Sequence, residues 1–132
     1  MKKINIGELA KGADVGVQTI RYYERRGLIP KPRRTDSGYR QYPPDTVTRV
    51  KFIKRAQELG FSLKEIAELI SLKSEETTDC GDIKSVAESK ITEIENKIRT
   101  LRDMKKALTK VVEICQGQGP LTDCPILEVM ET

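Results

Sequence analysis

The spacing of apolar residues predicts short helices over most of the first seventy positions of the chain. The first helix begins at Ile6, with Asn5 as its N-cap and Glu8 three residues later, which is the sequence pattern of a capping box. Glycines at Gly12 and Gly16 then mark a turn. The chain therefore opens with a helix that is followed by a short turn.

A second helix is expected over residues 17–26, because Gly27 and then Pro30 end the pattern. The helical spacing places Ile20 on its inward side and leaves polar side chains on its outward side. Two short helices across a glycine-containing turn are typical of a helix-turn-helix, whose second helix enters the major groove of DNA. The outward residues that we expect at DNA are Gln18, Thr19, Arg21 and Tyr22.

Residues 31–43 are rich in arginine and tyrosine and contain the turn sequence Asp36-Ser37-Gly38. This composition predicts a small β-hairpin, or wing, that would place arginines and tyrosines beside each other as phosphate contacts require. The residues of the wing that we expect at DNA are Arg34, Tyr39 and Arg40.

Two more helices complete the first half of the chain. A helix over about residues 45–59 carries one apolar stripe, and Gly60 ends it. Ser62 and Glu65 form a second capping box, which begins a fourth helix. The expected inward residues are Val47, Val50, Ile53 and either Ala56 or Gln57 in the third helix, and Leu63, Ile66, Leu69 and Ile70 in the fourth.

From Cys80 to Cys115 the pattern stays helical, without proline and, after Gly81, without glycine. Apolar residues recur at alternating steps of three and four, which is a heptad pattern with Lys105 as its one polar interruption. A single helix cannot bury this stripe, so we expect a homodimer in which two copies pack antiparallel. Folding back onto the first half of the chain is the alternative. The expected dimer seam is Ala87, Ile91, Ile94, Ile98, Leu101, Leu108 and Val112.

The predicted fold class is therefore mainly all-α. A winged helix-turn-helix domain is expected over residues 1–72 and a polar linker over residues 73–79. The antiparallel dimerisation helix follows over residues 80–115, and a metal-binding loop with a short C-terminal helix occupies residues 116–132.

Charge is distributed unevenly along the chain. Residues 1–72 carry 15 Lys and Arg against 8 Asp and Glu, whereas residues 73–132 carry 9 against 12. A basic first half predicts a domain that binds a polyanion, although a merely solvated basic face gives the same composition.

The sequence contains no histidine and no glycine-rich phosphate-binding loop. It therefore lacks Cys–His and Ser–His catalysis and the commonest general base, and we do not expect an enzyme. No apolar run reaches the about eighteen residues of a membrane span, and the first residues lack the apolar core of a signal peptide. We expect a cytoplasmic protein, in which the three cysteines remain reduced.

Residues 4–72 resemble the DNA-binding domain of the mercury-resistance (MerR) family. The resemblance is carried by three specific blocks, TIRYYERRGLI, GYRQY and LGFSLKEI. It implies a winged helix-turn-helix with Thr19, Arg21 and Tyr22 at the DNA and with Tyr39 and Arg40 on the wing. Members of the family follow this domain with different effector modules, so the effector must be inferred from the second half of the chain.

Cys80 and Cys115 are 35 residues apart, or five heptads, so they share one face of the expected helix. At ~1.5 Å per residue they lie ~50 Å apart, too far for one chain to hold an ion between them. In an antiparallel pair, residue 80 of one copy lies opposite residue 115 of the other. The glycine-containing loop over residues 116–123 can bring Cys124 beside Cys115. Each end of the dimer would then combine Cys80 of one subunit with Cys115 and Cys124 of the other.

Three thiolates without histidine favour a soft metal ion. Zinc usually takes a fourth ligand, and none is evident in the sequence. The prediction is mercury(II) as effector, at about one ion per inter-subunit site, with a lead(II) or cadmium(II) sensor as the alternative within this class. The other readings are a thiol redox sensor, an architectural DNA-binding dimer, and cysteines that are only small buried apolar residues.

The positions of Cys80 and Cys115 and the segment 124–127 also resemble the mercury-responsive members of the family, and Pro125 favours them. Lead-responsive members share much of this spacing. The resemblance implies a dimer that stays on promoter DNA with or without metal. It further implies that metal binding twists the DNA so that RNA polymerase can initiate.

Overall fold

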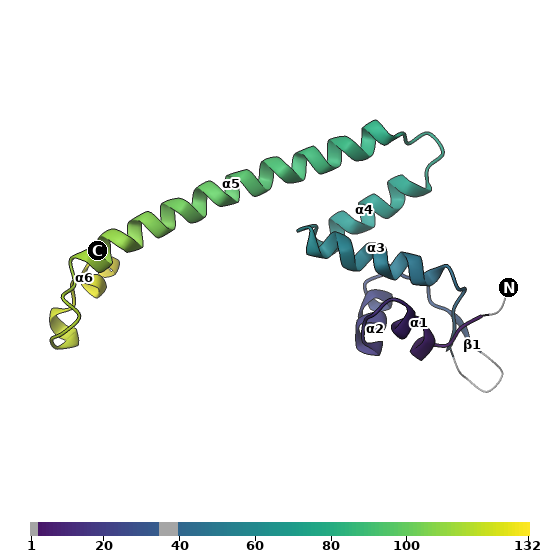
Figure 1. Cartoon of the computed structure of the whole chain (residues 1–132), viewed down its shortest axis with the longest axis horizontal. Coiled ribbons are helices and arrows are strands. Elements are labelled where there is room, and N and C mark those ends of the chain that lie inside the picture. The colour runs from purple at the N-terminus through teal and green to yellow at the C-terminus, as the bar shows by residue number, and fades with distance from the viewer. Residues whose placement is uncertain (1–2, 35–39) are drawn as a thin grey trace. The chain divides into compact units, whose positions relative to one another are not determined.

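The computed structural model describes residues 3–34 and 40–132, with side chains for all of these except Arg33, Arg34 and Arg40. The chain is mainly helical, as predicted (Figure 1). Its contacts divide it into two units, Met1–Lys84 and Ser85–Thr132. The first unit contains four short helices and a hairpin, and the second contains most of one long helix and the C-terminal segment.

The helix-turn-helix is formed by α1 (Ile6–Gly12) and α2 (Val17–Arg25). The predicted capping box is confirmed at the start of α1, where the Glu8 amide donates to Oδ1 of Asn5 at 2.8 Å and the Asn5 amide donates to Oε1 of Glu8 at 3.1 Å. In the turn, Asp14 adopts a positive φ of 55°, a conformation that aspartate tolerates better than most residues. The turn lets α1 and α2 pack against each other.

The wing is present as two short antiparallel strands, β1 (Arg33–Arg34) and β2 (Arg40–Gln41), with Arg34 opposite Arg40. The predicted turn Asp36-Ser37-Gly38 lies outside the described residues. Directly after β2, Tyr42 forms a bridge with Ile4, so the N-terminal segment lies beside the end of the wing.

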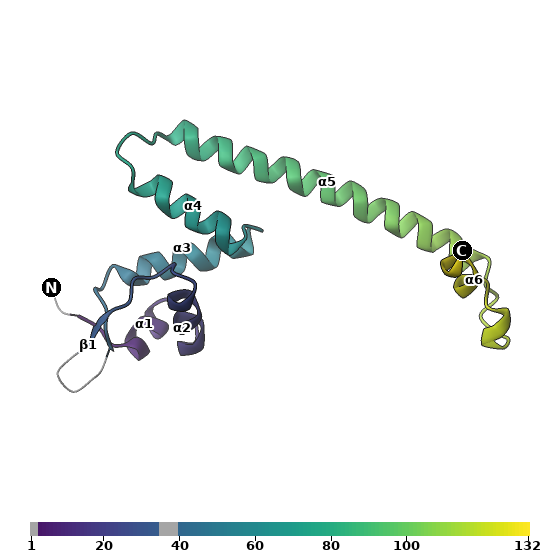
Figure 2. The ribbon, with the colours of Figure 1, turned by 180° about the vertical axis from the view of Figure 1, so that it is seen from behind.

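The third and fourth helices are α3 (Thr46–Glu58) and α4 (Leu63–Ser74), which lie against each other in both views of the ribbon (Figure 2). The second capping box is confirmed, with hydrogen bonds of 2.8 and 3.1 Å between Ser62 and Glu65. Of the two candidates for the last inward position of α3, Ala56 is buried and Gln57 is exposed. α4 extends to Ser74, two residues into the expected linker.

The core of the first unit is built from the inward residues of all four helices and from the residues around the wing. Each large side chain that is removed from water here contributes about 1.5–3 kcal/mol to folding. The fully buried members are Leu9, Ile20, Ile29, Tyr42, Val50, Ile53 and Ile66.

The long helix α5 runs over Cys80–Glu113. It begins at Cys80 because Asp79 and Asp82 cap it reciprocally, each accepting a hydrogen bond of 3.0–3.1 Å from the other's backbone amide. It ends two residues before the expected end. Along its surface Glu93 binds Lys90 at 2.7 Å and Lys97 at 3.2 Å, and hydrogen bonds from these two lysines lower the pKa of Glu93. Lys90 is buried, whereas the Glu93–Lys97 pair is exposed on both sides, and an exposed pair supports a helix only weakly.

After α5 the chain passes through the single 3-10 turn η1 (Leu121–Asp123) into α6 (Pro125–Glu131), which is the predicted short C-terminal helix. Pro125 occupies the first turn of α6, where its missing N–H costs nothing. Within the described residues, no helix combines the length and the apolar character needed to cross a membrane.

Candidate DNA-binding surface and metal-binding cysteines

The helix α2 has one buried and one exposed side. Ile20 is fully buried, as predicted, and Tyr23 and Glu24 lie on the same inward side. The predicted DNA contacts Gln18, Arg21 and Tyr22 are exposed and Thr19 is half-buried. Four neighbouring polar residues of a helix-turn-helix thus remain available to a ligand.

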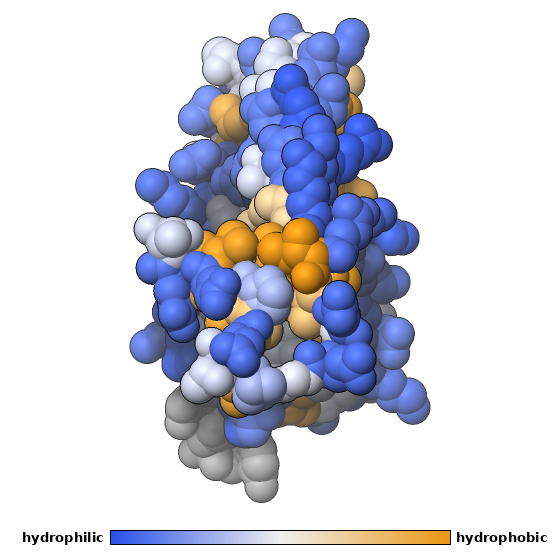
Figure 3. Space-filling model, turned by 90° about the vertical axis from the view of Figure 1, so that its left-hand side faces the viewer, coloured by the Kyte–Doolittle hydropathy of each residue, from blue (hydrophilic) through white to orange (hydrophobic). Residues whose placement is uncertain are grey.

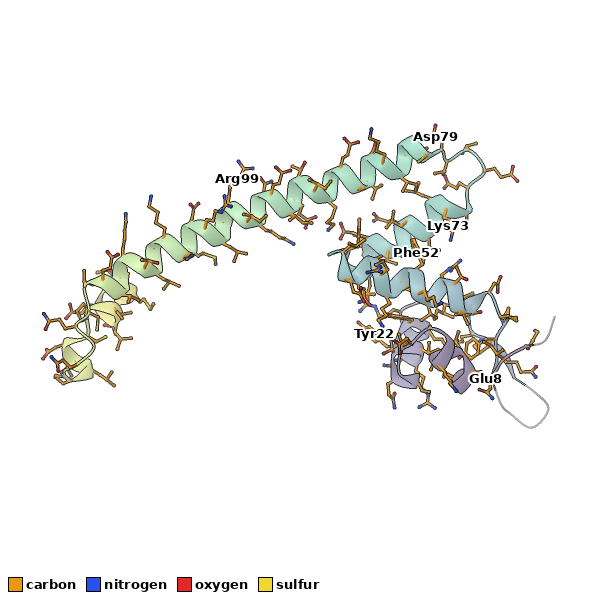
Figure 4. All side chains as sticks on the ribbon, viewed as in Figure 1. Glu8, Tyr22, Phe52, Lys73, Asp79 and Arg99 are labelled. Carbon is orange, nitrogen blue, oxygen red and sulfur yellow. The ribbon has the colours of Figure 1, made fainter. Side chains whose placement is uncertain are left out.

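A shallow hollow lies between the exposed side of α2 and helix α3. Three of the predicted contacts, Gln18, Thr19 and Tyr22, line it. The Arg25 guanidinium lies 5.9 Å from the centre of the Tyr22 ring, a cation–π distance that steadies the ring (Figure 4, where Tyr22 is labelled). Other polar residues that line the hollow, and that were not among the predicted DNA contacts, include Arg25, Lys54 and Gln57.

Two hydrogen bonds fix this surface to α3. The Tyr23 hydroxyl donates to Oε1 of Gln57 at 2.6 Å, and Nζ of Lys54 donates to the carbonyl oxygen of Asp14 in the turn at 3.0 Å. Burial raises the pKa of Tyr23, and the neighbouring Tyr22 raises it further, so the phenol keeps its proton and remains a donor above the pH at which an ordinary tyrosine ionises. One sequence feature could have indicated that Lys54 and Gln57 lie together at this surface. They are three residues apart on α3, which places both on one side of that helix.

Two of the three predicted DNA contacts in the wing lie on its paired strands. Arg34 and Arg40 are partners in the β1–β2 ladder. Their side chains, and the whole of Tyr39, lie outside the described residues. Arg34, Tyr39 and Arg40 therefore stay predictions as DNA contacts.

The stripe predicted as a dimer seam is exposed to solvent along α5. Its large residues are 38–63% exposed, far more than a core tolerates, and side chains radiate from α5 over its length (Figure 4). Met104, 55% exposed, lies between Leu101 and Leu108 in a groove that also includes Lys105 and Val112. Met104 continues the apolar stripe beside Lys105, the predicted polar interruption. The exposed members are Ala87, Ile91, Ile94, Ile98, Leu101, Met104, Leu108 and Val112.

Apolar side chains are also exposed at the C-terminal end of the chain. Figure 3 looks at this end and shows an apolar patch surrounded by hydrophilic residues. The exposed apolar residues of this segment include Ile114, Leu127, Val129 and Met130. Large apolar surface that a chain leaves uncovered is typical of an interaction site.

The three cysteines are free thiols. Cys80 is exposed at the first position of α5. Cys115 is half-buried in the turn after α5, where its Sγ accepts a hydrogen bond of 3.4 Å from the Gly117 amide. Cys124, also half-buried, is the N-cap residue of α6. Cys115 and Cys124 therefore flank one loop, whereas Cys80 lies at the opposite end of a 34-residue helix.

No three cysteine or carboxylate side chains converge into a metal site within the part of this chain that the structure describes. The length of α5, about 50 Å at ~1.5 Å per residue, accounts for this separation of Cys80 from the other two thiols. The donor set itself, three thiols in a chain without histidine, suits a soft ion that accepts few ligands.

Comparison with protein families agrees with this architecture. Residues 4–73 match the family described as MerR HTH family regulatory protein, and residues 47–111 match the family described as MerR, DNA binding. Together the two matches cover the helix-turn-helix, the wing, α3, α4 and most of α5.

Relatives match nearly the whole chain. The mercuric resistance operon regulatory protein of Bacillus cereus is 44% identical over 128 residues, which are 97% of both chains. Among solved structures, the regulator MerR of Bacillus megaterium MB1 in complex with mercury(II) is 38% identical, with a TM-score of 0.73 over 98% of this chain and 100% of that one. The regulator PbrR691 of Ralstonia metallidurans CH34 in complex with lead(II) is 31% identical, with a TM-score of 0.84 over 96% of this chain and 98% of that one. This chain therefore belongs to the MerR family of helix-turn-helix regulatory proteins.

Proposed function

We propose that this protein is a mercury(II)-responsive, DNA-binding transcription regulator of a metal-resistance operon. The observation that carries the proposal is the set of three free cysteines, without any histidine, at the two ends of α5. The similarity of nearly the whole chain to a mercuric resistance regulator supports it.

The proposed DNA-binding surface is the exposed side of α2 together with the wing. In a helix-turn-helix the second helix enters the major groove, and basic residues of a wing contact phosphates. The net positive charge of the first half of the chain favours this partner. A regulator on promoter DNA works in the cytoplasm, where thiols stay reduced. The residues proposed to contact DNA are Gln18, Thr19, Arg21, Tyr22, Arg34, Tyr39 and Arg40, and we add Arg25, Lys54 and Gln57 because they line the same hollow.

The proposed assembly is an antiparallel homodimer through α5. The apolar stripe from Ala87 to Val112 is exposed to water, and the identical stripe of a second copy can bury it. An antiparallel pair is favoured because it brings the start of one helix to the end of the other. That arrangement places Cys80 of one subunit near Cys115 and Cys124 of its partner.

The proposed mercury(II) ligands are therefore Cys80 of one subunit and Cys115 and Cys124 of the other. The cysteines suit this role because all three are free and none lies in the core of the first unit. Soft thiolates bind soft ions, and three such donors leave zinc one ligand short of its usual four. Metal binding at the ends of α5 would change how the two DNA-binding domains hold the promoter, so that the DNA is distorted and RNA polymerase initiates.

A lead(II) sensor is the second candidate, favoured by the lead(II)-bound regulator that superimposes with a TM-score of 0.84. Mercury(II) is preferred because the mercury(II)-bound structure shares more side chains with this chain, 38% against 31%. Side chains, rather than the path of the backbone, select a metal ion.

The test is a metal titration of the reduced full-length protein in the presence of a competing thiol, with mercury(II), lead(II), cadmium(II) and zinc(II) in parallel. The expected result is two mercury(II) ions per dimer, held more tightly than the other three. Tighter binding of lead(II) would replace the mercury proposal by the second candidate. Absence of tight binding by all four ions would contradict a metal-sensing role altogether.

A further inference from the structure

Tyr42 and Glu24 form a buried polar pair that joins the wing to α2. Tyr42 is the residue directly after β2, and its side chain is only 1% exposed. Its hydroxyl donates a hydrogen bond to Oε1 of Glu24, which is 8% exposed on the inward side of α2. A direct side-chain hydrogen bond therefore connects α2 to the residue that follows β2 of the wing.

The backbone of Tyr42 is held as firmly as its side chain. Its amide donates to the Ile4 carbonyl oxygen at 2.7 Å, and its own carbonyl oxygen accepts from the Ile4 amide at 2.9 Å. Tyr42 thus anchors the C-terminal end of β2 to the core of the first unit.

A polar pair is an expensive way to fill this space, because burying a carboxylate and a phenol removes both from water. Two apolar side chains of similar size would pack here without that cost. What a hydrogen bond adds is a narrow range of distance and direction between its donor and its acceptor. Glu24 lies one helical turn after Arg21 on a rigid helix, so a bond at Glu24 also locates the exposed side of α2.

We propose that Tyr42 and Glu24 are positioning residues that hold the wing at one distance and orientation from α2, so that both elements reach promoter DNA in one register. Neither side chain touches the DNA itself, since both are buried. The inference rests on the proposed function, in which α2 and the wing bind the promoter.

The test uses Tyr42→Phe in the full-length dimer, with operator DNA selected from a random-sequence pool by the wild-type protein. The substitution keeps the ring and removes only the hydroxyl. Operator affinity should fall about three- to tenfold, the usual effect of losing one buried hydrogen bond. In a hydroxyl-radical footprint, protection should weaken at the sites nearest the wing and persist at the sites contacted by α2.

A second background separates positioning from general packing. In the Glu24→Leu protein the acceptor is absent, so adding Tyr42→Phe should cause no further loss of affinity. Ile66→Val is the matched control, because Ile66 is fully buried on α4, which carries none of the proposed DNA contacts, and the loss of one methylene lowers stability. This control should melt at a lower temperature yet keep the wild-type affinity and footprint.

Wild-type affinity and footprint in Tyr42→Phe would overturn the inference, as would an equal loss from Tyr42→Phe in both backgrounds. If the wild-type pool selection yields no DNA, the proposed function fails first and the inference fails with it. A wild-type protein that binds its operator while Tyr42→Phe changes nothing overturns the inference alone.

Discussion

The hydroxyl of Tyr23 on α2 donates a 2.6 Å hydrogen bond to the side-chain oxygen of Gln57 on α3, and this bond links two residues 34 positions apart in sequence. Tyr23 packs its ring in the core while its neighbour Tyr22 faces outward, with the two ring centres 6.3 Å apart. One side of α2 therefore anchors the helix, and the other presents the residues proposed to contact DNA.

Tyr23→Phe should lower the free energy of unfolding by about 1 kcal/mol, the typical net value of one hydrogen bond. Because burial raises the pKa of Tyr23, the folded state holds the phenolic proton more tightly than the unfolded state does. The stability from this proton is complete below the unfolded pKa of about 10 and is lost as the pH rises through the folded pKa.

Urea unfolding at fixed protein concentration checks both statements. As the pH rises above the unfolded pKa of about 10, the wild-type protein should lose stability more steeply than Tyr23→Phe does, so the difference between them should shrink. A difference that stays constant over this range would show that the Tyr23 phenol is not coupled to folding.

Replacement of Ile94 and Ile98 by glutamate should break the dimer, because four charges would face each other in a seam that excludes water. Metal binding and tight operator binding should be lost with it. Analytical ultracentrifugation measures the assembly directly. The matched control replaces Asn96 and Thr100, on the opposite side of α5, by glutamate and should remain dimeric. A dimeric Ile94→Glu/Ile98→Glu protein would refute the proposed seam.

Arg21→Ala should weaken operator binding while the fold and the metal stoichiometry stay unchanged, because Arg21 is exposed on α2. Loss of one phosphate contact makes the plot of log affinity against log salt shallower by roughly one unit. Arg40→Ala, on the wing, should behave in the same way. Arg99→Ala is the control, since Arg99 is an exposed cation on α5 (Figure 4). Equal slopes of log affinity against log salt for Arg21→Ala, Arg40→Ala and Arg99→Ala would contradict the proposed DNA-binding surface.

The inter-subunit metal site is tested by mixing two inactive proteins. Cys80→Ala and Cys115→Ala homodimers should each lack both complete sites. In a heterodimer, one end pairs the intact Cys80 of one chain with the intact Cys115 and Cys124 of the other. The purified heterodimer should therefore recover one mercury(II) site, measured by thiol-competed titration. A site within one chain predicts no recovery, because each chain keeps its own lesion.

Local signals in the sequence were sufficient for most of the helices. Asn5 with Glu8 and Ser62 with Glu65 form the expected capping boxes, and Gly27 ends α2 close to the predicted position. These features depend on residues three or four positions apart, so neighbouring chemistry decides them before any tertiary contact forms. The family also follows from the sequence, because the blocks that carry the resemblance are continuous along it.

Tertiary structure decided what distant residues do together. The period of α3 left Ala56 and Gln57 as equal candidates for the core, and only the folded core of the first unit buried Ala56 and left Gln57 to accept the hydrogen bond from Tyr23. The buried bond between Tyr42 and Glu24 has no local signature, because it joins residues 18 positions apart that meet only when the wing closes on α2. The sequence alone determined the elements and the thiol chemistry through short-range propensity and residue type, whereas the surface that holds α2 and the wing in place depends on side-chain contacts that exist only in the folded chain.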